Sequence, residues 1–435
     1  MRIIYGLTLG SFYFIIFVRS YKISKDIFSP LCFFSFMQFI AYVPGIMFFE
    51  NHMGIELDEI NTFFVFVAQI LVAFFTWLGI RICKCLTNHN SHCTIEQKNV
   101  KSITFIGLVL YMLGLFSTIY FIVSVGGVHY IITHPQLNYA RGNSYLMSLQ
   151  NLMVIGILCL FGSNKKPSNL AIFITFGIYV LTIVIFTKRA PIIHALLLIL
   201  MAYNYRVRNI KPTDFFKPTV LFLVFLSILL IVSLPMLRNP LAFGVDVSFW
   251  DIFVEGIHRI DKVFEEYSFT SRDAFVYTNY HLDNMYYGRT LINFLTAPLP
   301  SSVFPWKPPV DDGIYLANFV AGYYILPPAN VYPIHNSFPF SSQGSMYANF
   351  GIIGLVIGAV ILGIIYEYFY MLLKDTEYNI FTIFVYHTII NTLALSSKNI
   401  TQTIIPIGLL IISFKIFTGI KLKKRRTKIE LGGNY

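Results

Sequence analysis

Charge is scarce in this sequence. Only 12% of its 435 residues are Asp, Glu, Lys or Arg, whereas a soluble domain usually has about 25%. Hydrophobic residues make up 56% of the chain, and the mean hydropathy is +0.66. A soluble core could not bury this much apolar surface, so the composition excludes a soluble globular domain and indicates a membrane protein.

Cysteine is also scarce, and its placement excludes a disulfide-stapled loop. None of the five cysteines lies between residues 238 and 344, which form the largest polar region. The other polar cluster of interest contains Cys83, Cys85, His89, His92 and Cys93. Its spacing fits no familiar zinc pattern, so we interpret it as a helix end with a short polar loop and predict no metal site.

Several catalytic signatures are missing. There is no Gly-rich loop followed by Lys and Ser or Thr, which argues against a pump with its own ATPase. A Gly-x-Ser-x-Gly elbow is absent as well. The net charge of +11 does not indicate nucleic-acid binding either, because the basic tail follows an apolar run directly and no folded basic domain accompanies it.

Long apolar runs fill most of the chain. Runs of about 17–25 apolar residues are typical of transmembrane helices. The sequence predicts an all-α, polytopic integral membrane helical bundle, with about 11 transmembrane helices and one large loop. The predicted spans are 3–18, 27–49, 61–83, 103–125, 145–161, 169–187, 190–205, 216–237, 345–373, 379–397 and 400–420. The first run lacks a small-residue cleavage site, so we expect a retained helix rather than a signal peptide.

The basic residues predict the orientation. The connections after the first, third, fifth, seventh and ninth runs, together with the C-terminal tail, carry twenty Lys and Arg residues. The opposite set of connections, without residues 238–344, carries five. Positive charge is concentrated on the cytoplasmic side of membrane proteins. We therefore predict a cytoplasmic C-terminus, an N-terminus on the outer side, and a large loop outside the cytoplasm.

The organisation follows from these runs. Residues 1–237 form an N-terminal membrane bundle with eight predicted spans, 238–344 the large loop, 345–420 three further spans, and 421–435 a basic tail. Within the loop, apolar residues recur every three or four positions from Phe249 to Tyr267, which predicts an amphipathic helix. Residues 298–339 are rich in proline, which predicts irregular chain with one short helix around residues 314–324.

Six cations are predicted to lie on the outer side: Arg141, Lys188, Arg189, Arg238, Arg289 and Lys307. Arginine binds phosphate with two parallel hydrogen bonds and keeps its charge, so the arginines are candidates for holding a phosphorylated lipid. Arg189 is the strongest candidate, because it lies between two apolar runs with almost no connection. For Lys188 and Lys307 we favour ordinary contact with the membrane interface.

The end of the loop offers further candidates. His335 and Asn336 lie just before the ninth predicted span, where a histidine can act as a general base. Many tyrosines precede them, including Tyr323 and Tyr324, and tyrosine suits sugar recognition by stacking and hydrogen bonding. Gly354 and Gly358 form a small-residue seam, which we interpret as close helix packing rather than chemistry.

Three short motifs carry a family resemblance. Thr187–Pro191 reads TKRAP, Ile334–Phe338 reads IHNSF, and Asn349–Gly354 reads NFGIIG. Together with the many spans and the single large loop, they resemble the Wzy-type O-antigen polymerases, the oligosaccharide repeat-unit polymerases of bacterial envelopes. The Arg-x10-Gly pattern of some members is not found at Arg141, Arg238 or Arg289.

The resemblance implies a multi-pass glycosyltransferase of the bacterial inner membrane with a periplasmic loop. It would move a growing glycan from undecaprenyl diphosphate onto a lipid-linked repeat unit, without metal or cofactor. Its partners would be the glycan donor, the glycan acceptor, the bilayer and a chain-length regulator. Arg189 and Arg289 would stabilise the leaving diphosphate, and His335 would act as base, with Asp311 or Asp312 as weaker candidates. Arg141, Arg238, Asn336, Tyr323 and Tyr324 would contact the substrate.

Other functions stay open from the sequence. An O-antigen ligase uses the same donor with a different acceptor, and the sequence barely separates it from a polymerase. A transporter or flippase of lipid-linked oligosaccharide is less favoured, since the chain has no two-fold hydropathy repeat. A scaffolding subunit of an envelope complex is the last alternative.

Overall fold

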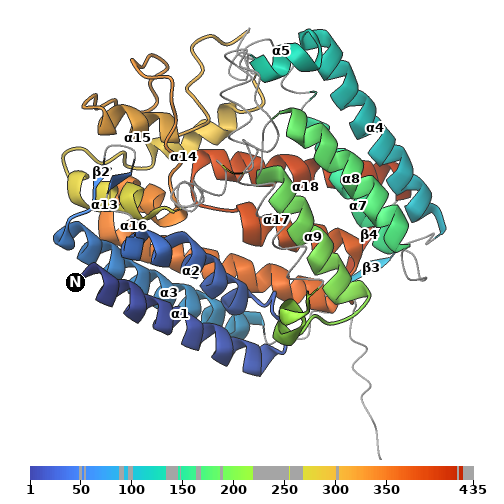
Figure 1. Ribbon diagram of the computed structural model, residues 1–435, viewed down its shortest axis with the longest axis horizontal. Coiled ribbons are helices and arrows are strands. Elements are labelled where there is room, and N and C mark those ends of the chain that lie inside the picture. The colour runs from blue at the N-terminus through green and yellow to red at the C-terminus, as the bar shows by residue number, and fades with distance from the viewer. Residues whose placement is uncertain are drawn as a thin grey trace, which may run out of the picture.

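Figure 1 shows a computed structural model of the chain. The structure describes residues 1–48, 51–52, 55–87, 93–96, 101–133, 146, 148–162, 168–186, 190–218, 254, 268–299, 303–418 and 421–424. The predicted amphipathic helix from Phe249 to Tyr267 lies outside these residues, apart from Val254, and so does almost all of the predicted span 216–237.

Helices dominate the described residues, and the predicted all-α class is confirmed. The first part of the chain contains α1 (Arg2–Ser24), α2 (Pro30–Phe48), α3 (Glu59–Thr87), α4 (Lys101–Val125), α5 (Gly127–Thr133), α7 (Asn151–Cys159), α8 (Asn169–Ile185) and α9 (Ala190–Arg206). The second part contains α13 (Thr270–Asn279), α14 (Arg289–Ile292), α15 (Gly313–Val320), α16 (Ser342–Asp375), α17 (Ile380–Thr392) and α18 (Ser397–Thr418). The 3₁₀-helices are η2 (Leu160–Gly162), η3 (Pro212–Phe216) and η4 (Asn293–Thr296).

The described residues include two short antiparallel strand pairs, one before α3 and one that involves the start of the basic tail. Strand β1 (Asn51–His52) pairs with β2 (Ile55–Glu56) shortly before α3. Strand β3 (Cys93–Glu96) pairs with β4 (Lys421–Lys424), so that Cys93 lies opposite Lys424. The second pair fixes the start of the basic tail against the connection between α3 and α4.

Among the described residues, five helices are long and apolar enough to cross a membrane: α1, α2, α3, α16 and residues Ile103–Val125 of α4. Shorter apolar helices follow at Asn151–Gly162, Asn169–Ile185, Ala190–Arg206 and Ile380–Thr392. These nine segments and α18 occupy the positions of all the predicted spans except 216–237. The apolar runs therefore predict where helices form, and the five long helices indicate a membrane protein.

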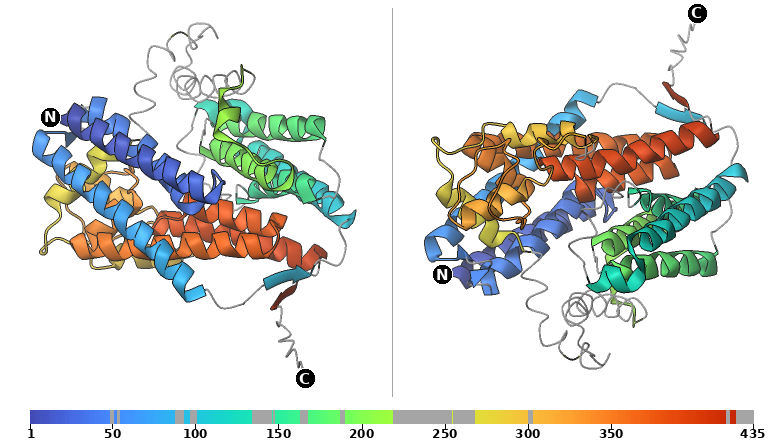
Figure 2. Two further views of the ribbon diagram at one scale, coloured as in Figure 1. Left: turned by 90° about the horizontal axis from the view of Figure 1, so that it is seen from below. Right: turned by 90° about the horizontal axis from the view of Figure 1, so that it is seen from above.

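The helices form two groups, with α17 and α18 between them (Figure 2). The first group contains α1, α2, α3 and α16, and the second contains α4, α7, α8 and α9. Small residues bring backbones together in both groups. A Cβ atom on Gly363 of α16 would meet the carbonyl oxygen of Thr76 in α3, and one on Gly156 of α7 would lie 2.6 Å from the carbonyl oxygen of Gly107 in α4.

The NFGIIG motif forms a sharp kink in α16. Phe350 has φ −143° and ψ 15°, and Gly351 has φ 61° and ψ −150°, which interrupts the helix. A Cβ on Gly351 would lie 2.8 Å from Cε of Met285, and one on Gly358 would lie 2.8 Å from Cγ of Met346. The segment before the kink therefore folds back onto the segment after it. The seam at Gly354 and Gly358 serves packing, as the sequence predicts, with Met346 of the same helix as its partner.

The bundle has two distinct ends, named here the loop end and the basic end. At the loop end, the N-terminus lies beside residues 268–341 and the turn before α3 (Figure 2), and Nη1 of Arg2 donates to the carbonyl oxygen of Leu57 at 3.3 Å. At the basic end, the turn Lys25–Phe28 meets the last turns of α9 and α16 through hydrogen bonds from Tyr205 and Tyr370 to Asp26.

Candidate functional site

Asn349 of the NFGIIG motif holds the loop segment that carries Arg289. Its side-chain Oδ1 accepts hydrogen bonds from the backbone N–H of Gly288 and the hydroxyl of Thr290, both at 3.0 Å. Its carbonyl oxygen accepts from the backbone N–H of Tyr287, also at 3.0 Å. Asn349 is buried, so these bonds are shielded from water. Arg289 begins the short helix α14 directly after this clamp, and its side chain is exposed.

The structure brings Arg289 and Tyr324 together. The Tyr324 hydroxyl donates to the carbonyl oxygen of Asn284 at 2.9 Å, and its ring stacks on Tyr286 with centroids 6.3 Å apart. Partial burial raises the pKa of Tyr324, and the nearby positive charge of Arg289 offsets part of this rise. The adjacent Tyr323 is half exposed. Arg289, Tyr323 and Tyr324 thus form an open surface with one cation and two aromatic rings.

His335 lies on a different part of the loop end. The buried side chain of Asn318 in α15 fixes the preceding residue, because its Nδ2 donates to the carbonyl oxygen of Ile334 at 2.8 Å and its Oδ1 accepts from the backbone N–H of Ile334 at 3.0 Å. The exposed His335 ring packs edge-on against Tyr332 with centroids 5.0 Å apart. In the part of the chain that the structure describes, no hydrogen bond or ring contact joins His335 to Arg289 or Tyr324.

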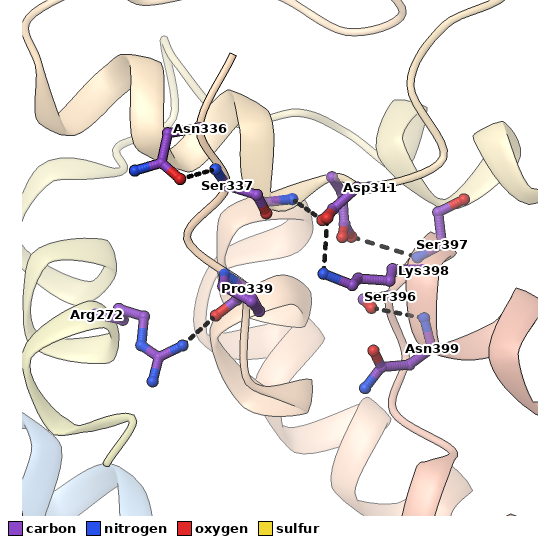
Figure 3. Close-up of polar contacts among 11 residues, drawn as sticks. Arg272, Asp311, Asn336, Ser337, Pro339, Ser396, Ser397, Lys398 and Asn399 are labelled. Carbon is purple, nitrogen blue, oxygen red and sulfur yellow. Dashed lines mark hydrogen bonds and ion pairs between the residues drawn. The ribbon is translucent and has the colours of Figure 1, made fainter. Parts of the chain in front are cut away.

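Asn336 caps its own turn, since its Oδ1 accepts from the backbone N–H of Ser337 at 2.9 Å (Figure 3). This bond occupies the side-chain oxygen. Asn336 is exposed, and its amide nitrogen makes no hydrogen bond among the described residues, so this donor remains available to a ligand.

Asp311 and Asp312 connect the loop to the first residues of α18 (Figure 3). Oδ2 of Asp311 lies 2.6 Å from Nζ of Lys398, and Oδ2 of Asp312 accepts from the backbone N–H of Ser397 at 3.3 Å. Burial, together with the charge of Asp311, raises the pKa of Asp312 to about 7. That pKa would suit a general base, but Asp312 is only 1% exposed. We therefore interpret Asp312 as a residue that positions the loop.

Three predicted site residues, Arg141, Arg189 and Arg238, lie outside the described residues. The chain next to Arg189 is informative nevertheless. Ala190 and Pro191, which follow Arg189 directly, line a cavity of about 350 Å³ between α7, α8, α9, α17 and α18. We call it the polar cavity, because its walls include Asn151, Thr388, Thr392 and Gln402.

A second hollow adjoins the polar cavity, and the two share Ser148 and Ile405 as lining residues. It has a volume of about 560 Å³ and lies between η4 of the loop, the start of α7 and one face of α18. We call it the apolar groove, because its walls are almost entirely hydrophobic, with Leu149, Phe294, Leu295, Ile404 and Leu409 among them. An apolar space next to a polar space fits an amphipathic molecule.

Two histidines from different helices face each other in the polar cavity. The rings of His194 in α9 and His387 in α17 have centroids 6.4 Å apart and are nearly perpendicular. Nδ1 of His194 and both ring nitrogens of His387 are buried without a hydrogen-bond partner among the described residues, although the backbone of His194 lies near His387. Buried polar atoms are nearly always hydrogen-bonded, so these nitrogens indicate space for a polar ligand.

Neither histidine is among the candidates that the sequence predicts. Each is a single polar residue inside an apolar run, and the pair has no motif spacing, because the two residues belong to different helices. One general signal could have found them, since an ionisable residue inside a predicted membrane span is more often functional than not.

Comparisons with known proteins place no constraint on this site. No family model matches the chain, and neither curated proteins nor solved structures show a significant match. Among the described residues, no group of three or more His, Cys, Asp or Glu side chains could hold a metal ion. The chemistry of the site is therefore argued from its own residues.

Proposed function

We propose that this protein is a glycosyltransferase that polymerises lipid-linked oligosaccharide repeat units at the outer face of a bacterial inner membrane. One observation carries the proposal: the apolar groove adjoins the polar cavity at the loop end of the bundle. A polyprenyl diphosphate-linked glycan has a hydrocarbon chain, a charged diphosphate and a sugar portion in that order. The groove and the adjoining cavity offer matching environments for the hydrocarbon chain and the diphosphate. The exposed loop surface, with Tyr323 and Tyr324, offers aromatic rings for the sugars.

Each part of the substrate has a proposed binding region. The polyprenyl chain lies in the apolar groove along α18 and η4. The diphosphate enters the polar cavity, where imidazole and amide groups donate hydrogen bonds. Arg189 directly precedes the cavity-lining Ala190 in the chain and supplies permanent positive charge. The sugars extend toward Arg289, Tyr323 and Tyr324.

The reaction needs three contributions from the protein. A hydroxyl oxygen of the acceptor sugar attacks the anomeric carbon of the donor, and the bond from that carbon to the diphosphate oxygen breaks. The carrier diphosphate leaves with the bonding electrons, which fixed positive charge from Arg189 and Arg289 stabilises. The hydroxyl proton goes to a base, for which the exposed His335 is our candidate.

The proposal includes the finer topology that the sequence predicts. The chain would have about eleven spans, with the basic end and the C-terminus in the cytoplasm. The N-terminus and residues 238–344 would then face the periplasm. Reporter fusions at the described loop residues, for example after Gly322 on the exposed turn that follows α15, test this orientation directly.

The decisive experiment is deletion of the gene followed by gel analysis of the envelope glycan. A polymerase defect gives core with a single repeat unit and no ladder. Bare core with polymer left on its carrier lipid would instead identify a ligase, and an unchanged ladder would overturn the proposal. Complementation with an Arg189→Ala variant separates catalysis from scaffolding, because a scaffold retains the ladder at normal expression.

A further inference from the structure

A separate cavity lies at the basic end of the first helix group, away from the groove and the polar cavity. It has a volume of about 500 Å³ and is bounded by α1, α3, α16 and the start of α2. We call it the basic pocket, because four of its lining residues are cations: Arg19, Arg81, Lys84 and Lys374. Among the described residues, its lining contains a single carboxylate, that of Glu367.

Most of this positive charge has no acidic partner. The Lys84 ammonium lies 3.4 Å from the buried Glu367 carboxylate, which neutralises one cation. Arg81 and Lys374 contact the rings of Trp77 and Tyr370 at 5.5 Å and 4.1 Å, and such contacts orient a cation without cancelling its charge. Arg19 makes no ion pair among the described residues. The pocket therefore keeps a net charge of about +3, from three helices that converge on one space.

The lining is apolar on the side toward the middle of the bundle. Ile16, Trp77 and Ile80 each precede a pocket cation on the same helix, Arg19 on α1 or Arg81 on α3, by about one turn or less. Trp77 is partly exposed, and Phe74 on the same helix is half exposed. Fixed positive charge beneath an exposed hydrophobic helix surface fits a phosphate headgroup attached to hydrocarbon chains better than a free inorganic anion.

We propose that the basic pocket is a binding site for an anionic glycerophospholipid of the surrounding membrane. The phosphate lies among Arg19, Arg81 and Lys374, and the acyl chains lie against Ile16, Trp77 and Ile80. Bound there, the lipid contacts α1, α3 and α16 at once and stabilises their packing. The site is independent of the polymerase proposal and requires only that the chain resides in a membrane.

Trp77 provides a local reporter of the acyl chains. The chain has three tryptophans, so Trp250→Phe and Trp306→Phe substitutions in the full-length protein leave Trp77 as the only one. Phosphatidylglycerol with brominated acyl chains, added to the protein in detergent, should quench Trp77 fluorescence with a saturable dependence. Brominated phosphatidylcholine with the same chains should bind at least tenfold more weakly, because it carries no net negative charge.

Charge variants test the headgroup contact. Each membrane-facing cation changes affinity for an anionic lipid about fivefold, so Arg19→Gln with Arg81→Gln should weaken phosphatidylglycerol binding about 25-fold. The matched control is Lys22→Gln with Lys415→Gln, which removes the same charge from exposed positions outside the pocket and should change binding less than twofold. All four side chains are exposed, so neither variant should unfold the protein.

Three outcomes would overturn the proposal. Equal quenching by the two lipids would show that the headgroup charge is not recognised. An equal loss of binding in the control variant would show that general surface charge attracts the lipid. Inorganic phosphate that displaces the brominated lipid at millimolar concentration would assign the pocket to free phosphate instead.

Discussion

The two ends of the bundle are each held by a buried aspartate, but the two aspartates join different parts of the molecule. At the basic end, Oδ2 of Asp26 accepts hydrogen bonds from the hydroxyls of Tyr205 and Tyr370, both at 2.9 Å. Tyr205 belongs to α9 of the second helix group and Tyr370 to α16 of the first. A single carboxylate therefore joins the two groups.

At the loop end, the carboxylate of Asp273 in α13 joins the loop to the first group. It accepts from the Tyr42 hydroxyl at 2.6 Å and from the Ser341 hydroxyl at 2.7 and 2.8 Å, which fixes α13 against α2 and the start of α16. The adjacent Arg272 donates hydrogen bonds to the carbonyl oxygens of Ser268 and Pro339. These bonds join the start of α13 to the chain just before α16.

The difference explains why the apolar groove and the polar cavity lie at the loop end. The second helix group is joined to the first at the basic end, whereas at the loop end the Asp273 cluster binds the loop to the first group alone. The apolar groove and the polar cavity lie where η4, α17 and α18 meet the second group, on the side that this cluster does not close. We infer that the scaffold is fixed at the basic end and leaves space at the loop end.

The largest expected loss of stability comes from removing the hydrogen bonds to Asp26 at the basic end. Asp26→Ala leaves two buried tyrosine hydroxyls and the backbone N–H of Phe28 without their acceptor. Each buried polar group left unpaired costs about 1–3 kcal/mol, so we expect a loss of roughly 3–5 kcal/mol in the free energy of unfolding. Thermal unfolding in detergent measures this loss.

Tyr378→Phe is the matched control for Asp26→Ala. The Tyr378 ring stacks on Tyr205 with centroids 4.9 Å apart, but its hydroxyl makes no hydrogen bond among the described residues. Its removal should change stability by less than about 0.5 kcal/mol. An Asp26→Ala protein as stable as this control would mean that the basic end does not hold the two groups together.

The next largest effect is expected in the pH dependence of stability, which two buried carboxyl groups at the loop end determine. Burial raises the pKa of Asp273 to about 6, despite hydrogen bonds from Tyr42 and Ser341, and Asp312 is raised to about 7. In the unfolded chain both groups titrate near pH 4, so between about pH 4 and pH 7 the folded state holds protons that the unfolded state has lost. Stability should therefore fall as the pH rises through this window.

The expected size is roughly 3 kcal/mol for Asp273, because its pKa is shifted by about two units. Asp273→Asn should remove this share of the pH dependence and leave that of Asp312. Denaturation midpoints at several pH values for the wild type and the variant provide the measurement. A wild-type stability that rises between pH 4 and pH 7 would contradict the assignment of these carboxyls.

The sequence predicts the helices well because an apolar run of sufficient length has few alternatives to a helix in a membrane. It also predicts the short helix in the proline-rich segment, found as α15 at Gly313–Val320, and the packing role of the glycines in α16. These features depend on local composition, which the sequence contains directly.

The hydrogen bonds between segments that are distant in the sequence are much harder to predict. Asp26, Asp273 and Asn349 look like ordinary solvated polar residues, since nothing nearby in the sequence shows that they are buried. Their partners come from helices far away in the chain, so their roles depend on tertiary packing. His194 and His387 were missed for the same reason. The catalytic roles assigned to Arg289 and His335 stay predictions.

A smaller loss of stability should follow from removing the hydrogen bonds by which Asn349 holds the segment that carries Arg289. Asn349→Ala removes the acceptor for the backbone N–H of Gly288 and the hydroxyl of Thr290, and we expect a loss of about 2 kcal/mol. Hydrogen exchange should increase at residues 286–290 and stay unchanged around Asp26 at the other end. Increased exchange at both ends would show that the two ends are not independent, which would weaken the comparison.

The smallest effect is expected at the ion pair between Asp311 and Lys398, where both side chains are about one-third exposed. Partly solvated pairs contribute about 0.5–1 kcal/mol, so a double-mutant cycle with Asp311→Asn and Lys398→Met should give a coupling free energy of that size. The positive charge of Lys398 also lowers the pKa of the buried Asp312. Lys398→Met alone should therefore extend the pH-dependent loss of stability to higher pH, whereas an unchanged profile would mean that Lys398 does not act on Asp312. A coupling above about 2 kcal/mol would instead make this contact a second strong joint, and the loop end would then be fixed as firmly as the basic end.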